Sequence, residues 1–183
     1  MKLAFKDIEI ERKKIVESIN STQANLRNAL DNKTSAALFH ALKFNKIGCD
    51  PLNSSVQWNL VEQINQTFTY LVSLKAAEFL YSEFKDIEII EFNLGTQGGF
   101  DLIAKDEYGC DIVVAEVFAA VKAHSNDKLR QDILKVMKSN AKYRYVFFTA
   151  DGVADSNPYT QYHPKFDVSG VKVVSLNAKD LWK

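Results

Sequence analysis

The sequence predicts an α/β (α+β) fold, in which a central mixed β-sheet of about five strands is flanked by helices and preceded by an N-terminal helical hairpin. Three observations predict it. Amphipathic segments of helical period fill the first half of the chain, and short apolar segments separated by turns follow. Residues 111–120, DIVVAEVFAA, are apolar at almost every position. Because strand side chains alternate between faces, this segment indicates a strand covered on both sides.

Length and composition indicate an ordinary globular chain. It has 183 residues, of which 46% are apolar and 25% charged, and its formal net charge is zero. We expect one compact protein with a helical hairpin at 1–48 and an α/β core at 49–183. The charge balance gives no argument for a global attraction to nucleic acid or membrane. No signal peptide or segment of membrane length is evident, so we expect a cytoplasmic location. Cys49 and Cys110 lack the spacing of a disulfide framework or a zinc site.

The helical half of the chain predicts three helices. Residues 6–31 form the first, and 35–47 form the second, with Thr34 as its N-cap and Gly48 as its stop. We expect this hairpin to cover the sheet; dimerisation and clamping of a partner are the alternatives. Residues 50–55 predict a turn in which Ser54 or Ser55 caps a long helix from about 56 to 84.

The second half predicts five strands. The first three lie at 87–94, 100–105 and 111–120. The second and third are expected to be antiparallel, joined by a turn at Tyr108-Gly109 in which the glycine supplies a positive φ. A helix at 127–139, capped by Ser125 or Asn126, leads to a fourth strand at 143–149. A long loop, a strand at 171–176 and a short helix at 178–182 complete the chain.

Two acids in the predicted sheet lead to the candidate site. Glu116 lies inside the apolar strand, where an ionised carboxylate is unfavourable unless it is paired or binds a metal. Asp101 follows the pair Gly98-Gly99 and opens the preceding strand. Two carboxylates on adjacent strands converge without loop flexibility and suit a hard cation.

The order helix, strand, strand, strand, helix, strand resembles the PD-(D/E)xK nuclease superfamily, which has the restriction-endonuclease-like fold. The resemblance covers residues 56–149 and rests on Gly98-Gly99-Phe100-Asp101, on Glu116-Val117-Phe118 and on Glu78 of the preceding helix. It implies that Asp101 and Glu116 bind Mg²⁺ or Mn²⁺, that the Val117 carbonyl is a further metal ligand, and that Glu78 is a direct or outer one.

Phe118 departs from the family pattern, because the lysine of the motif should stand at this position. The family tolerates relocated lysines, and the candidates are Lys128 first, then Lys75, and Lys122 just past the strand. Lys75 and Glu78 also have the spacing of an intrahelical ion pair. Alternatively, Glu116 is the buried partner of Lys128 or Lys75, and Asp101 caps a turn.

The resemblance implies a Mg²⁺-dependent endonuclease that hydrolyses DNA phosphodiester bonds, in restriction, defence or DNA processing. The helix with Lys128, Arg130, Lys135 and Lys138 is the expected basic surface for DNA. The N-terminal helices are the expected surface for a homodimer. The alternative is a catalytically degenerate relative of this fold that binds DNA or a protein.

Overall fold

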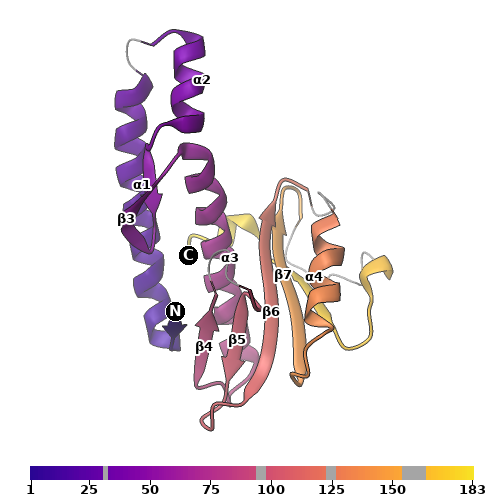
Figure 1. The fold of residues 1–183 in the computed structure, drawn as a ribbon. Coiled ribbons are helices and arrows are strands. Elements are labelled where there is room, and N and C mark those ends of the chain that lie inside the picture. The colour runs from indigo at the N-terminus through magenta and orange to yellow at the C-terminus, as the bar shows by residue number, and fades with distance from the viewer. Residues whose placement is uncertain (31–32, 94–97, 123–126, 154–163) are drawn as a thin grey trace. The chain divides into compact units, whose positions relative to one another are not determined.

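A computed structural model describes the chain except for residues 31–32, 94–97, 123–126 and 154–163 (Figure 1). The described residues form a mixed α/β fold with a sheet of order β1-β4-β5-β6-β7-β8 and a separate two-stranded sheet, β2-β3. The expected fold class is confirmed at this level. Contacts divide the chain into two compact units, one of residues Met1–Ile8 and Thr69–Lys183 and the other of residues Glu9–Phe68. The expected hairpin boundary at residue 48 falls inside the second unit.

The six-stranded sheet combines an antiparallel half with a parallel half. β4 (Ile89–Phe92), β5 (Leu102–Lys105) and β6 (Asp111–Ala120) are antiparallel neighbours. β7 (Tyr143–Ala150) and β8 (Lys172–Ser175) continue the sheet in parallel to β6. The order of strands along the chain is as predicted, and β6 has the predicted bounds. β1 (Lys2–Leu3), which pairs with β4, was not predicted because two residues show no periodicity.

Helices lie on both faces of this sheet (Figure 1). Phe79 of α3 (Leu60–Glu83) contacts the rings of Tyr145 and Phe147 in β7. α4 (Lys128–Val136) packs on the other face, because its apolar residues share a core cluster with Val146 and Phe148. Successive residues of a strand point to opposite faces. The sheet therefore separates α3 from α4.

α4 begins and ends within the helix predicted at 127–139, and the predicted caps Ser125 and Asn126 lie outside the described residues. The turn before β6 has Gly109 at φ +80°, as the Tyr-Gly pair predicts. The C-terminal helix at 178–182 is a single 3₁₀ turn, Ala178–Asp180.

The unit of residues Glu9–Phe68 corrects the predicted helix stop, the predicted cap of the long helix and the point where that helix starts. α1 (Ile8–Leu30) and α2 (Ser35–Phe44) form as expected, and the Thr34 hydroxyl accepts a hydrogen bond from Ala37 N–H. Gly48 is not a helix stop but begins β2 (Gly48–Asp50), which pairs with β3 (Asn53–Trp58). Ser54 and Ser55 therefore belong to a strand. The long helix α3 starts at Leu60, where the Asn59 side chain caps it by accepting Glu62 N–H at 2.9 Å.

In the part of the chain that the structure describes, no helix combines the length and the apolar character needed to cross a membrane.

Candidate functional site

Asp101 and Glu116 lie side by side across the β5–β6 pair. The register places Leu102 opposite Ala115, so the residue before β5 meets Glu116. Val117 N–H donates to Asp101 Oδ2 at 2.8 Å, and Asp101 N–H donates to Glu116 Oε1 at 3.3 Å. Each carboxylate is thus held by the backbone of the other acid's strand. The structure brings together the two acids that the sequence analysis singled out.

Glu116 is buried, with 1% of its surface exposed, and its partner is Lys135 of α4. The Lys135 ammonium lies 2.7 Å from Oε1 and 2.8 Å from Oε2, so it spans both oxygens of the carboxylate. The Lys135 side chain is 43% exposed, so its stem reaches from the surface to the buried acid. A lysine from the helix after the motif strand therefore reaches Glu116, and it is Lys135 that forms this ion pair.

The electrostatics of the pair follow from burial. Removal from water raises the pKa of Glu116 to about 7, because burial and the neighbouring Asp101 charge outweigh the hydrogen bond from Lys135. Burial also raises the pKa of Asp101, against the opposing hydrogen bond from Val117 N–H and the charges of Lys135 and Lys128. Burial therefore disfavours the ionised form of both neighbouring carboxyl groups.

Lys128, the lysine favoured from the sequence, is bound to a different acid. Its ammonium lies 2.6 Å from Oδ1 of Asp132, one turn further along α4. Burial lowers the pKa of Lys128, but the hydrogen bond to Asp132 and the charges of Asp132, Asp101 and Glu116 outweigh it, so the net shift is upward. Lys128 therefore belongs to the same electrostatic cluster as Asp101 and Glu116 without being the direct partner of either Glu116 oxygen.

Asp132 is a member of the site that the sequence analysis missed. It is 2% exposed, and burial raises the pKa of its carboxyl group. A signal was present, because Asp132 lies between Leu129, Ile133 and Val136, the buried apolar residues of α4. An acid on the apolar side of a helix is as conspicuous as Glu116 in its strand.

Phe118 is part of the core. It faces the same side of the sheet as Glu116, is 5% exposed, and stacks on Phe148 with ring centroids 5.4 Å apart. The position that the motif would give to a lysine is therefore filled by an aromatic ring packed against other rings. Lys122, the other nearby candidate, lies on the exposed segment after β6.

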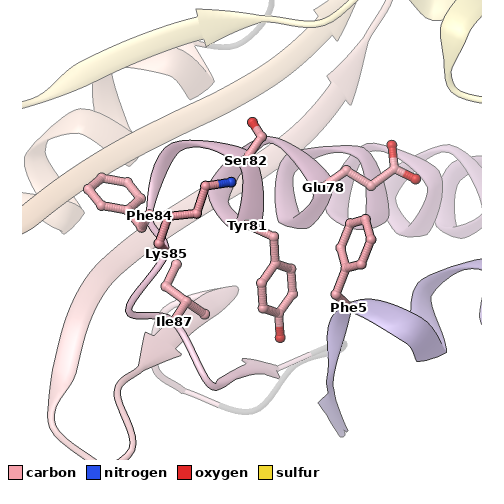
Figure 2. A pocket seen from close by; sticks show the side chains of 7 residues that line it. All are labelled: Phe5, Glu78, Tyr81, Ser82, Phe84, Lys85 and Ile87. Atoms are coloured by element: carbon pink, nitrogen blue, oxygen red, sulfur yellow. The ribbon is translucent and has the colours of Figure 1, made fainter.

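Lys75 and Glu78 lie elsewhere. They form the intrahelical ion pair that their spacing indicates, at 3.0 Å, on α3 and thus across the sheet from α4. Glu78 also lines an open pocket of about 510 Å³ with Phe5, Tyr81 and Phe84. Figure 2 shows Glu78 beside Phe5 at one end of this pocket and Phe84 with Lys85 at the other. The structure therefore gives these two residues a setting separate from the Lys135–Glu116 contact.

The donor set suits a hard cation. Asp101 and Glu116 offer carboxylate oxygens, which Mg²⁺ prefers, and Val117, whose carbonyl is the further expected ligand, is fixed between them by its N–H bond to Asp101. Within the described residues, no group of three or more His, Cys, Asp or Glu side chains stands ready to hold a metal. Mg²⁺ usually retains several waters, so two carboxylates could hold it without a third acidic ligand.

Comparison of the chain with protein-family models, with curated proteins and with solved structures finds no match.

Proposed function

We propose that this chain is a Mg²⁺-dependent nuclease that hydrolyses DNA phosphodiester bonds, with a restriction-endonuclease-like core. The observation that carries the proposal is the contact between Asp101 and Glu116. Each carboxylate accepts a backbone N–H from the other acid's side of the strand pair, and the Lys135 ammonium forms an ion pair with Glu116. Metal-assisted hydrolysis uses oxygen ligands to hold the cation, and a nearby ammonium group stabilises the charge that develops on the phosphate. Lys135 takes the role that the sequence analysis assigned to Lys128 or Lys75.

The topology supports the same proposal. Three antiparallel strands are followed by α4 and by a strand parallel to the third. This is the order on which the resemblance to the PD-(D/E)xK superfamily rests. It places Asp101 before the second of the three antiparallel strands and Glu116 within the third, with α4 over the glutamate.

The roles of the residues follow from their positions. Asp101 and Glu116 would hold the cation, which, when bound, lowers the pKa of a water and neutralises charge on the phosphate. Glu116 would hold the cation in place of the Lys135 ammonium. Lys135 would then orient the attacking water and stabilise the charge that develops on the phosphate oxygens. Its half-exposed side chain allows this movement.

The surface of α4 is suited to a polyanion. Arg130 is 69% exposed, Lys128 and Lys135 are each about two-fifths exposed, and Lys138, just past the end of α4, is exposed as well. Positive side chains along one helix attract the phosphate backbone without reading its sequence. The same helix thus carries the proposed lysine and the cations that would hold DNA beside it.

One observation favours a second candidate, a catalytically degenerate relative of this fold that binds DNA or a protein. Phe118 fills the lysine position with core packing, and Lys135 already neutralises Glu116. In this alternative the Lys135–Glu116 pair is structural, and divalent cations do not bind.

The two candidates differ in nicking of supercoiled plasmid with Mg²⁺ or Mn²⁺. We expect cleavage by the wild type, and loss of about 100-fold or more in Lys135→Met, the effect of removing one group that stabilises transition-state charge. Lys128→Met should retain more activity than Lys135→Met, because Lys128 does not contact Glu116. The exposed Glu107→Gln serves as the control of an acid outside the site.

The nuclease proposal would be refuted if the wild type does not nick plasmid in the presence of Mg²⁺ or Mn²⁺. It would also be refuted if the Glu116→Gln variant is as active as the wild type. Retained gel-shift binding of DNA by such an inactive protein would then support the degenerate candidate.

A further inference from the structure

One oxygen of Asp132 is unsatisfied in the part of the chain that the structure describes. Oδ1 accepts the hydrogen bond from Lys128 at 2.6 Å, whereas Oδ2 is buried and has no hydrogen-bond partner among the described residues. The residue is 2% exposed, so bulk water does not serve this oxygen. A buried acceptor without a donor destabilises the folded protein by about 1–3 kcal/mol, and a ligand that donates a hydrogen bond to it would remove this cost.

The setting of Asp132 points to a cation. The charge of Asp132 raises the pKa of Glu116, and the charge of Asp101 raises the pKa of Asp132. The three carboxylates therefore share one electrostatic environment. α4 directs Lys128, Asp132 and Lys135 to the same side, since they are spaced by four and three residues. Against these three acids the cluster holds two ammonium groups, which leaves one negative charge unbalanced when all three acids are ionised.

We propose that Asp132 is a third acid of the cation site, and that its Oδ2 accepts a hydrogen bond from a water molecule bound to the metal. This inference rests on the proposed function and adds a residue from α4 to the two acids of the strands. Lys128 holds Oδ1 and so fixes the orientation of the carboxylate, as outer partners of metal sites commonly do. An outer contact of this kind needs no preassembled group of three ligands, because Mg²⁺ and Mn²⁺ keep water in their shells.

Titration calorimetry with Mn²⁺ on the full chain tests the proposal without relying on activity. We expect Asp132→Asn to weaken Mn²⁺ binding by about 10–100-fold, the usual effect of removing an outer partner. Asp101→Asn should abolish binding. The matched control is Asp127→Asn, the same change at the exposed N-cap of the same helix, where φ is +54° and asparagine is well tolerated. It should bind Mn²⁺ as the wild type does.

The outcomes separate the two proposals. Wild-type affinity in a folded Asp132→Asn variant overturns the role of Asp132 and leaves the nuclease proposal standing. No Mn²⁺ binding by the wild type overturns both.

If Asp132→Asn does not fold, the comparison moves to Lys128→Met and the double variant Lys128→Met/Asp132→Asn, in which both charges of the ion pair are removed together. The double variant should then bind Mn²⁺ more weakly than Lys128→Met, and equal affinities would overturn the proposal.

Discussion

Replacing Glu116 with glutamine should remove much of the pH dependence of folding stability near neutrality. The pKa of Glu116 is raised from its ordinary 4.5 to about 7 in the folded protein, chiefly by burial. The folded chain therefore binds this proton more tightly than the unfolded chain does. Its contribution to stability is fully present below pH 4.5 and is lost as the pH rises through about 7.

The size of the effect follows from the two pKa values. The rise from 4.5 to about 7 corresponds to a fall in the free energy of unfolding of about 3 kcal/mol between acidic and mildly alkaline pH. Glutamine is neutral throughout and keeps an oxygen that can accept the hydrogen bonds of Lys135 and Asp101 N–H. The free energy of unfolding of the variant should therefore not show this fall. The difference in unfolding free energy between variant and wild type should shift in favour of the variant as the pH increases.

Urea unfolding with a chelator present, from about pH 5 to about pH 8 at constant ionic strength, measures the effect. The quantity compared is the slope of the unfolding free energy against pH, so that a constant cost of the substitution cancels. Glu107→Gln, at an exposed turn, should keep the wild-type slope. Equal slopes for Glu116→Gln and the wild type would show that Glu116 does not titrate in this range and would refute the reasoning.

Two further predictions concern packing. Phe118→Lys restores the lysine of the motif pattern, but it removes the ring stacked on Phe148 and buries an ammonium group. Thermal unfolding should therefore show that the free energy of unfolding falls by about 4 kcal/mol. A variant as stable as the wild type and more active would contradict this. Gly48→Ala places a Cβ 2.6 Å from Gln63 Oε1, and urea unfolding should show a loss of about 1–3 kcal/mol. Gly98→Ala, whose Cβ would meet nothing within 4 Å, is the control, and an equal effect at both glycines would show that the close approach to Gln63 is unimportant.

The sheet was predictable wherever burial imposes a pattern on the sequence. β6 is covered on both faces, its residues are apolar almost throughout, and its predicted and observed bounds agree. The prediction for residues 53–58 was wrong for the opposite reason, since these residues form β3. Its residues Asn53–Val56 are exposed and carry no apolar alternation, so Asn-Ser-Ser was interpreted as a turn and a helix cap. Strand pairing with β2 overrides that local preference.

The juxtaposition of Asp101 and Glu116 was predictable, whereas the lysine that reaches Glu116 and the buried acid Asp132 were not. Asp101 and Glu116 lie on neighbouring strands, and the antiparallel register alone brings them together. Lys128 and Lys135 are two turns apart on one side of the same helix, so their sequence positions are nearly equivalent. Which of them reaches Glu116 depends on how α4 docks on the sheet, and no local pattern encodes that position.

The two lysines give the buried acids counterions of their own. Lys135 neutralises Glu116 and Lys128 neutralises Asp132, so no bound ion is needed to bring these carboxylates into the interior. Small metal-dependent domains, in contrast, unfold when a chelator removes the ion that holds their ligands together. Under the proposed function, folding and cation binding would therefore be separate events. A chelator would remove the ion without unfolding the chain, because Lys135 and Lys128 already pair with Glu116 and Asp132.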